Sequence, residues 1–252
     1  MFSEAVGLKI RRGFTLLELM VSVAIIAVLI SVLLPALLKA RQVSHRTVCM
    51  GNLKQLGYAF QQYLFDHRRF PQAAEAMDWH YGGVEFRDAG GLVLATLTAN
   101  RPLNSVLSDT LPTVSGELAG LYRCPADSGL WRGRASRAGS VSVLDGKSCY
   151  SMFGNSYRAN LNLLDSTSAG IDDRRRPLFE HEVVVAPSRL LVTGDSAWYY
   201  GTRSSDDADA GIDASWHGDD RSGNFLAMDS SVRFTSFSGE TSPVYTLSPR
   251  PR

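Results

Sequence analysis

The sequence predicts an α+β protein in which one long N-terminal helix packs against an antiparallel β-sheet head. Three observations support this fold class. An uncharged apolar run extends from Leu19 to Leu38, and apolar residues at helical spacing continue to about Arg69. Beyond Pro71 the composition shifts to Gly, Ser, Asp and Pro with short β-type runs, which favours a sheet packed on the second half of the helix.

The apolar run is long enough to cross a membrane. It has 20 residues, which as a helix span about 30 Å, the thickness of the hydrocarbon core of a bilayer. A cleavable signal peptide has a shorter apolar core, and no A-x-A-like site follows this run. The flanking cations are balanced, so charge alone does not set the orientation; they are Lys9, Arg11 and Arg12 before the run, and Lys39, Arg41 and Arg46 after it.

The second part of the predicted helix carries an amphipathic stripe. Gly51 and Gly57 lower the helix propensity, but the pattern persists until Pro71. We therefore expect a nearly continuous helix of about 50 residues from Phe14. Its apolar stripe is expected to pack beneath the head and consists of Val48, Leu53, Leu56, Phe60 and Leu64.

A carboxylate stands at the front of the apolar run. Glu18 is costly inside a bilayer unless it lies at the interface or has a partner. A short basic leader ends at Gly13, and cleavage after Gly13 would create an ammonium on Phe14, about one helical turn from Glu18. That ammonium is a natural partner for the carboxylate, in the same chain or in a neighbouring one.

The stretch RRGFTLLELMVSVAIIAVLISVLLPAL resembles the N-terminal segment of type IV pilins and of type II secretion pseudopilins. The resemblance covers about the first 60 residues. It implies that a prepilin peptidase cuts after Gly13, that Phe14 becomes N-methylated, and that Glu18 neutralises the terminus of a neighbouring subunit during assembly. Pro35 falls where the helix of this family often carries a proline.

The same resemblance implies an organisation for the whole chain. Residues 1–13 form a cytoplasmic leader that is removed, 14–70 the long helix with 14–38 in the membrane or filament core, and 71–252 a β-rich globular head. The implied location is the bacterial inner membrane, single-pass, with the head in the periplasm or outside. The implied partners are the prepilin peptidase, other pilin or pseudopilin subunits, and an inner-membrane assembly platform.

Several stretches of the head have strand and turn character. The segments 121–129 and 148–160 are expected to form short strands and turns, and the runs EVVVA and RLLVTG in 177–200 are expected to be strands. The segment 223–237 predicts a β-hairpin. Its turn contains Asp229-Ser230, which suits a two-residue type I′ turn less than Asp-Gly does, so we expect a longer loop.

The C-terminal part resembles a motif of large pilin-like proteins, H-x9-DG, whose DG lies in a stretch similar to N-V-L-F-A-D-G-H-V. His217, Asn224 and Asp229 match it in WHGDDRSGNFLAMDSSVRF. Eleven residues separate His217 from Asp229 instead of nine, and Ser230 replaces the glycine. The CPAD and PSRLLVTGDS stretches are similar to the same group, and the resemblance implies no enzymatic role.

The three cysteines and the acidic residues leave two questions open. A disulfide between Cys124 and Cys149 is chemically permitted outside the cytoplasm, and two buried free thiols are the alternative. Cys49 is then left on a helix face. Calcium is conceivable at a loop that carries acidic side chains, but the spacing matches no EF-hand and a solvated loop is favoured; its candidate ligands are Asp206, Asp207, Asp209 and Asp213.

An enzymatic reading starts from Gly-Asp-Ser at 194–196, which resembles the nucleophile block of GDSL-type ester hydrolases with Ser196 as the nucleophile. The nearest partners, Asp213 and His217, have the wrong spacing for that family, and no βα alternation surrounds them. We therefore expect a protein that is not an enzyme. The net charge of +1 and the scattered basic residues also predict no nucleic-acid partner.

These observations predict a structural subunit of a type II secretion-like pseudopilus or a type IV pilus. The alternative is a membrane-anchored extracytoplasmic protein whose head binds a carbohydrate or another envelope component. Its tryptophans would supply stacking faces, although buried tryptophan is the commoner arrangement; they are Trp79, Trp131, Trp198 and Trp216.

Overall fold

The computed structural model describes the chain in segments. These are residues 15–72, 78–84, 101–107, 117–132, 147–171, 173, 175–202, 212–214, 216–218 and 221–251. Gly13, Phe14, Asp206, Asp207 and Asp209 lie outside the described residues, as does the side chain of Asp213. By contact density the chain divides into residues 1–41 and residues 42–252.

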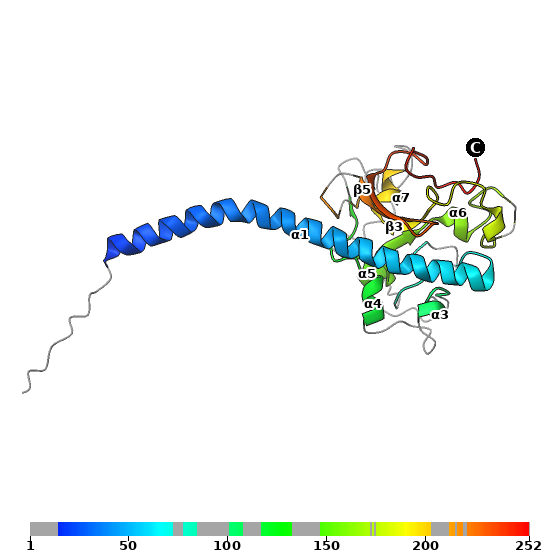
Figure 1. The fold of residues 1–252 in the computed structure, drawn as a ribbon, viewed down its shortest axis with the longest axis horizontal. Helices are drawn as coiled ribbons and strands as arrows, with labels where there is room; N and C mark the ends of the chain where they lie inside the picture. Colours follow the sequence, from blue (N-terminus) through cyan, green and yellow to red (C-terminus); the bar gives the residue numbers. More distant parts are fainter. Residues whose placement is uncertain are drawn as a thin grey trace, which may run out of the picture. The chain divides into compact units, whose positions relative to one another are not determined.

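The long helix predicted from the sequence is present. Helix α1 runs from Leu16 to His67, 52 residues with Pro35 inside it. It ends where Arg68 adopts a positive φ of 55° and the chain pairs with a later segment through Arg69 and Phe179. The helix and the sheet described below confirm the predicted α+β class (Figure 1).

The main sheet is antiparallel and has four strands in the order β2-β3-β5-β6. The strands are β2 Tyr157–Ala159, β3 Leu191–Asp195, β5 Ser222–Ala227 and β6 Val232–Ser236. A small second sheet pairs β1 Trp131–Arg132 with β4 Ile212–Asp213. Short helices complete the head; they are α3 Asn104–Leu107, α4 Glu117–Leu121, α5 Cys149–Phe153, α6 Leu161–Leu164, the 3₁₀ turn Glu180–Glu182 and α7 Ala197–Gly201.

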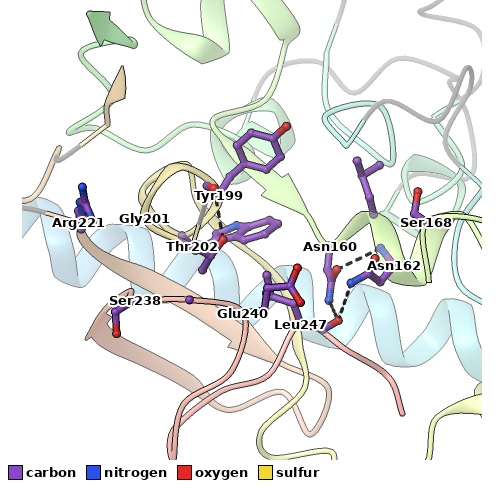
Figure 2. Close-up of a pocket in the computed structure, with 13 residues that line it drawn as sticks. Asn160, Asn162, Ser168, Tyr199, Gly201, Thr202, Arg221, Ser238, Glu240 and Leu247 are labelled. Atoms are coloured by element: carbon purple, nitrogen blue, oxygen red, sulfur yellow. Dashed lines mark hydrogen bonds between the residues drawn. The ribbon is translucent and has the colours of Figure 1, made fainter. Parts of the chain in front are cut away.

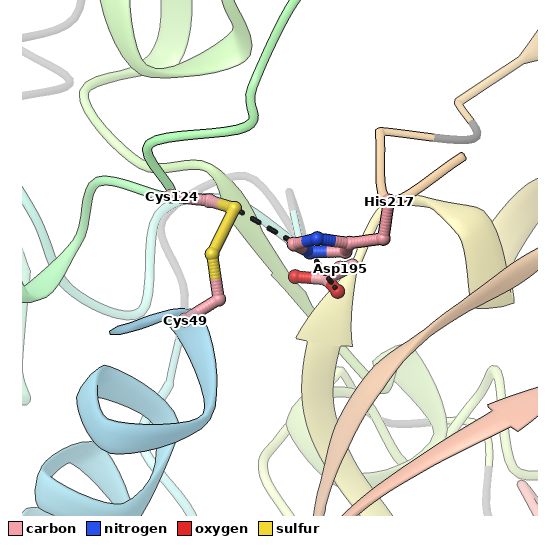
Figure 3. Close-up of side chains that lie close together, drawn as sticks. All are labelled: Cys49, Cys124, Asp195 and His217. Atoms are coloured by element: carbon pink, nitrogen blue, oxygen red, sulfur yellow. Dashed lines mark hydrogen bonds and ion pairs between the residues drawn. A yellow bond between two sulfur atoms is a disulfide. The ribbon is translucent and has the colours of Figure 1, made fainter. Parts of the chain in front are cut away.

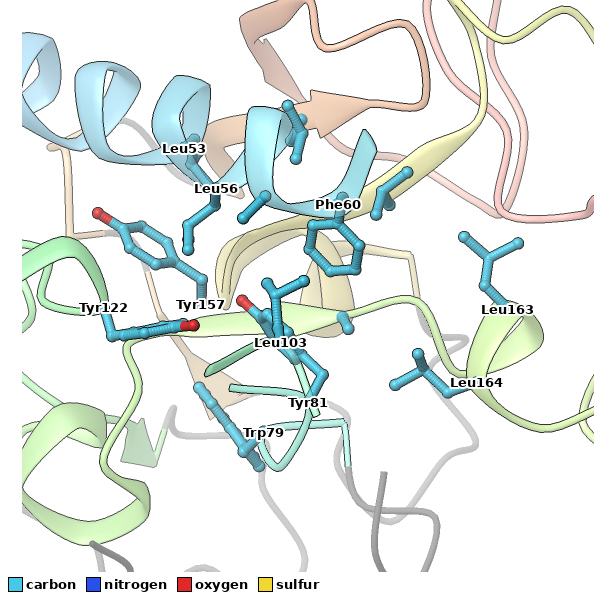
Figure 4. Close-up of a cluster of buried hydrophobic side chains, with 14 of the residues drawn as sticks. Leu53, Leu56, Phe60, Trp79, Tyr81, Leu103, Tyr122, Tyr157, Leu163 and Leu164 are labelled. Atoms are coloured by element: carbon cyan, nitrogen blue, oxygen red, sulfur yellow. The ribbon is translucent and has the colours of Figure 1, made fainter. Parts of the chain in front are cut away.

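Both faces of the main sheet are covered, because successive strand residues point to opposite sides. On one face Leu226 joins the core formed with the second half of α1, drawn in Figure 4. On the other face Phe225 and Ala227 pack with α7 and with the C-terminal residues Phe237 and Tyr245. The second half of α1, the sheet and this C-terminal layer thus form three layers.

The stripe that docks α1 is shifted by one residue at its start. Leu53, Leu56, Phe60 and Leu64 are buried as predicted, but Val48 is 49% exposed and Cys49 is fully buried in its place. The hydrophobicity of valine suggested the wrong residue, since a face through residues 53 and 56 continues to 49 at a spacing of four.

The hairpin confirms the longer loop expected from Asp229-Ser230. Leu226 pairs with Val232, Ser230 N donates to Ala227 O (2.9 Å), and Ala227 N donates to the carbonyl of Ser231 (2.8 Å). Ser230 has φ of 62°, the left-handed conformation that glycine adopts at no steric cost. The glycine of the H-x9-DG motif would stand at this left-handed position.

Three strand predictions in the head are wrong. The segment 121–129 contains the end of α4 and turns, but no strand. Residues 149–153 form α5, because Ser148 caps that helix by accepting a hydrogen bond from Ser151 N and Gly154 ends it with φ of 70°. The EVVVA run is not a strand; Val184 and Val185 donate to the carbonyl of Pro249 without forming a ladder. The RLLVTG run is strand β3, as predicted.

Candidate functional site

The first candidate region is the start of α1. Thr15 Oγ1 accepts a hydrogen bond from Glu18 N (3.2 Å), and the Oε2 atom of Glu18 accepts from Thr15 N (2.9 Å) and Thr15 Oγ1 (2.8 Å). This reciprocal arrangement is a capping box, which satisfies two N–H groups that the helix leaves without partners. Glu18 therefore has a local role that the sequence reasoning missed, although the T-x-x-E spacing carried the signal.

The helix that follows this cap is apolar around its whole circumference. Leu17, Ile25 and Leu29 are 71%, 55% and 57% exposed, and the other large apolar residues from Leu16 to Leu38 are exposed to similar degrees. Among the described residues, this helix alone is long and apolar enough to cross a membrane. An apolar surface on all sides suits lipid or a bundle of helices, in contrast to an amphipathic stripe.

The second candidate region is a buried polar cluster in the head, where α1 meets the sheet (Figure 3). Cys49 on α1 forms a disulfide with Cys124, with the two Cα atoms 5.2 Å apart. His217 Nε2 lies 3.0 Å from Asp195 Oδ2 and 3.6 Å from Cys124 Sγ. Both side chains of the His217–Asp195 pair are fully buried.

This disulfide overturns the Cys124–Cys149 pairing that the sequence permitted. Cys149 is a buried free thiol at the start of α5, and its backbone N–H donates to Asp127 Oδ1 (2.9 Å). Cys124 and Cys149 both belong to the head, so sequence proximity favoured them. The docking of α1 brings Cys49 to Cys124 across a separation of 75 residues.

The C-terminal motif residues separate into two places. Asn224 Nδ2 lies 3.2 Å from His217 Nε2. Asn224 also donates two hydrogen bonds to Asp195 Oδ2, one from Nδ2 (2.9 Å) and one from its backbone N–H (2.6 Å). Asp229 lies at the exposed hairpin turn, where its Oδ1 accepts from Ser231 N (2.9 Å). The carboxylate that meets His217 is thus Asp195 of the Gly-Asp-Ser stretch.

Gly194 explains why this stretch begins with glycine. A Cβ at Gly194 would lie 2.5 Å from the carbonyl oxygen of Asn224 and 2.9 Å from the Cα of Phe225. The close approach of β3 and β5 therefore requires glycine, and it places Asp195 beside Asn224. Ser196, the nucleophile of the hydrolase reading, is fully buried at the junction of β3 and α7, and Asp195 takes the place beside His217.

Asp127 of the CPAD stretch organises the loop beside the disulfide. Its carboxylate accepts hydrogen bonds from Cys149 N, Tyr150 N (2.8 Å), Gly129 N and Ser156 Oγ (2.7 Å). Burial raises the pKa of Asp127, and these hydrogen bonds oppose the rise. The sequence analysis assigned Asp127 no role. The local pattern that could have indicated one is an Asp two residues before a glycine whose N–H it accepts in a turn.

Another buried charged pair lies elsewhere in the head. Arg158 Nη2 and Nε both lie 2.6 Å from Asp78 Oδ2, and the guanidinium stacks over the ring of Tyr199. Burial lowers the pKa of Arg158, but the Asp78 carboxylate outweighs this and raises it overall. We therefore assign this ion pair a structural role in the interior of the head.

A surface cleft bears on the binding-protein alternative. It has a volume of about 730 Å³ and lies beside α6, α7 and the segment 238–247 (Figure 2). The amides of Asn160 and Asn162 that line it donate to Leu247 O, and Trp198 is 3% exposed with its Nε1 donating to Arg158 O. Trp79 and Trp216 are buried as well, so the three tryptophans whose side chains are described offer no stacking face.

Two known protein families match parts of the chain. The prokaryotic N-terminal methylation motif matches residues 8–34, and the family described as a protein of unknown function (DUF1559) matches residues 38–185. The DUF1559 match includes Cys49 and Cys124 of the cluster; Asp195, His217 and the hairpin lie beyond its end.

Curated relatives match over 67 residues, 27% of this chain. Type II secretion system core protein G is 33% identical in Pectobacterium carotovorum subsp. carotovorum and 34% identical in Klebsiella pneumoniae, over 43% and 48% of those proteins. Competence protein ComGC of Halalkalibacterium halodurans is 35% identical over 66% of its length. The match thus spans less than two thirds of each relative.

No solved structure matches the chain. The DUF1559 match covers more than half of the sequence, and the methylation motif ends shortly before it. The relatives identify the N-terminal segment as pilin-like. The chain therefore belongs to the DUF1559 family and carries the N-terminal segment of type IV pilins and pseudopilins.

Proposed function

We propose that this chain is a structural subunit of a type II secretion-like pseudopilus or a type IV pilus, processed after Gly13 and assembled through its N-terminal helix. The observation that carries the proposal is the exposed apolar surface of residues 16–38, with one carboxylate, Glu18, in the first helical turn. The match to the methylation motif at residues 8–34 supports it.

The apolar half of α1 needs a non-aqueous environment. Burying one Val, Leu or Ile side chain contributes about 1.5–3 kcal/mol, and this segment exposes more than a dozen. A bilayer covers them before assembly, and the helices of neighbouring subunits cover them in a filament. Such a transfer exchanges one apolar environment for another, so it leaves the charge of Glu18 as the group that needs a specific partner.

The geometry of Glu18 is compatible with both capping its own helix and pairing with the amino terminus of a neighbouring subunit. Its recorded hydrogen bonds to Thr15 use Oε2. Oε1 can therefore accept a hydrogen bond from the N-methylated ammonium of Phe14 of a neighbouring subunit while the capping box persists. In this account the capping box orients the carboxylate, and the ion pair with the neighbour sets the register of assembly.

Processing, membrane insertion and the location of the head follow from the same proposal. The prepilin peptidase acts on the leader, the inner-membrane platform inserts the subunit, and the head stands in the periplasm or outside. The subunit is a substrate of an enzyme and carries out no catalysis itself. The homologous proteins named type II secretion core protein G and ComGC support assembly with other pilin-like subunits.

The test separates the charge of Glu18 from its capping role. Glu18→Gln keeps the capping box, since Gln also serves at this position, but removes the charge. Thr15→Ala removes the cap and keeps the charge. We expect Glu18→Gln and Glu18→Ala to be cleaved normally yet to lose nearly all incorporation into filaments, whereas Thr15→Ala is incorporated with a modest loss. Incorporation is measured as the sheared filament fraction in the native host.

Processing is measured by intact mass and N-terminal peptide analysis. The wild-type chain is expected to begin at N-methylated Phe14, and Gly13→Val is expected to accumulate uncleaved. Normal assembly of Glu18→Gln would contradict charge pairing with a neighbour, and capping of the helix would then be the role of Glu18. An uncleaved Met1 terminus in the wild type would overturn the subunit proposal and favour the membrane-anchored binding protein.

A further inference from the structure

The buried cluster of the head contains more ligand atoms than a disulfide needs. Cys49, Cys124, Asp195 and His217 each offer one ligand atom, all four residues are buried, and these atoms lie within 4.8 Å of one another (Figure 3). They come from α1, the CPAD loop, the end of β3 and the segment before β5. Residues from four parts of the chain therefore converge on one point.

Two distances from His217 are close to those between zinc ligands. With Zn–S of about 2.3 Å and Zn–N and Zn–O of about 2.0–2.1 Å in a tetrahedral site, neighbouring S and N ligands lie about 3.6 Å apart, and N and O ligands about 3.3 Å apart. His217 Nε2 lies 3.6 Å from Cys124 Sγ and 3.0 Å from Asp195 Oδ2. The two thiolates and the imidazole are ligands that zinc prefers.

Neighbouring residues hold the proposed ligands in place, but some buried polar atoms of the cluster have no hydrogen-bond partner among the described residues. Asn224 donates to Asp195 Oδ2 through both its backbone and its side chain, as the outer partners of metal ligands do. Asp195 Oδ1, His217 Nδ1 and Asn224 Oδ1 are buried and have no hydrogen-bond partner among the described residues. Such a concentration of unpaired polar atoms in one place needs a physical explanation.

We propose that Cys49, Cys124, Asp195 and His217 form a tetrahedral Zn²⁺ site when the two cysteines are reduced. The disulfide and the zinc site exclude each other, because bonded sulfurs lie about 2.05 Å apart whereas two zinc-bound thiolates lie about 3.7 Å apart. A phosphine reductant opens the disulfide: two thiols form, and the phosphine becomes a phosphine oxide with oxygen from water. Zn²⁺ then replaces the two thiol protons, which are released.

The site gives the head two ways to hold its helix. Cys49 is the first fully buried residue on the docking face of α1. The disulfide ties this point to the CPAD loop in the oxidised chain. In the reduced chain, zinc ties the same point to the CPAD loop and also to β3 and to the segment before β5. The docking of the helix is thus maintained before the disulfide forms.

The test uses the full-length chain in detergent, reduced with the phosphine, and zinc alone as the probe. We expect one Zn²⁺ per chain after gel filtration, and Co²⁺ in its place should show the thiolate charge-transfer band and the strong visible bands of a tetrahedral site. The oxidised wild-type chain is a control of the same sequence and fold, and it should bind no zinc.

Four variants test the ligands, one outer partner and one control thiol. Cys49→Ser should weaken zinc binding by more than the roughly 100-fold upper end seen for outer partners of metal sites, and Asn224→Ser by about 10–100-fold. Cys149→Ser removes the other buried thiol and should bind zinc like the wild type. Asp195→Asn should weaken binding with little change of shape.

The proposal is overturned if the reduced wild type binds no zinc, or if Cys149→Ser loses zinc as Cys49→Ser does. Equal zinc in the oxidised and reduced chains would also overturn it, since the metal would then lie elsewhere. Circular dichroism of each variant shows whether a loss of zinc comes from unfolding; for a variant that unfolds, the comparison of oxidised and reduced wild type decides the question.

Discussion

The two halves of helix α1 are built for different surroundings. In residues 16–41 the apolar side chains cover the whole circumference and are exposed, with Leu29 57% accessible. In residues 42–67 one stripe of apolar side chains is buried, and its Leu53 and Leu56 are fully buried beneath the head. Backbone hydrogen bonding is helical throughout.

This difference shows that a single secondary structure can serve two solvents. In the first half, helical hydrogen bonds and the capping box satisfy the backbone groups, which is what a bilayer demands. Among the apolar residues there, side-chain identity matters little beyond hydrophobicity. In the second half, complementarity with the sheet decides each residue. Substitutions of apolar residues should therefore have position-specific effects on the stability of the head only in the second half.

The largest effect is expected from a matched pair of leucines. Leu56→Ala creates a cavity in the core and should lower the free energy of unfolding of the head by about 2–5 kcal/mol. Leu29→Ala, in the apolar half, should change it by less than about 0.5 kcal/mol. Both are measured by denaturant unfolding of the oxidised chain, followed by head tryptophan fluorescence. Equal losses in the two variants would mean that the halves are not independent.

Two glycines of the helix sharpen the comparison. A Cβ at Gly57 would lie 2.8 Å from Leu226 Cδ1 and 3.2 Å from Ser230 Cβ, whereas nothing lies within 4 Å of one at Gly51. Gly57→Val should destabilise the head by about 1–3 kcal/mol through overpacking against the hairpin. Gly51→Ala should stabilise it by about 0.5–1 kcal/mol through helix propensity. Thermal unfolding measures both, and stabilisation by Gly57→Val would contradict close packing at this contact.

The last expected effect concerns pH and the segment that pairs with the end of α1. Glu182 accepts from Arg176 Nη1 (2.7 Å) and Nη2 (2.8 Å), which lowers the pKa of Glu182 to about 2, with help from Phe179 N and against the effect of burial. Since the unfolded pKa is about 4.3, the contribution to stability is present above that value and is lost as pH falls towards 2. We expect a loss of about 1–2 kcal/mol between pH 5 and pH 2.

The control for this titration is a nearby glutamate. Glu182→Gln should remove this part of the pH dependence, as measured by unfolding at pH 5, 3.5 and 2. Glu180→Gln should leave it in place, because Glu180 is exposed and lies 3.6 Å from an exposed Arg68. Amide exchange of residues 16–41 should stay unchanged over this range, so a pH-dependent opening there would argue against separate behaviour of the two halves.

The sequence predicted the features that depend on local pattern. The long helix, its docking stripe from Leu53 onward, the hairpin at 223–237 and its longer loop were all visible in periodicity and turn residues. Short segments were less predictable, because five-residue stretches such as Cys149–Phe153 have strand-like composition and become helical only through their caps. Val48 was predicted to be buried in place of Cys49, because hydrophobicity was given more weight than helical spacing.

The buried cluster needed the tertiary structure. His217 and Asn224 were found through a motif, but their partner Asp195 belonged to a Gly-Asp-Ser stretch that suggested other chemistry. Cys49 lies on a helix far from Cys124 in sequence, and no local rule connects a helix-face cysteine with a particular loop. Only the docking of α1 on the sheet decides that pairing.

By itself the sequence determined that this protein has an apolar N-terminal helix with a carboxylate at its start, and that a head with an antiparallel sheet follows. These properties come from side chains acting with their near neighbours, by hydrophobic period, capping and turn preference. The tertiary structure alone decided which cysteines meet, which carboxylate faces His217, and why Gly57 and Gly194 have no side chain. Those features depend on contacts between segments far apart in the chain, whose distances no local pattern encodes.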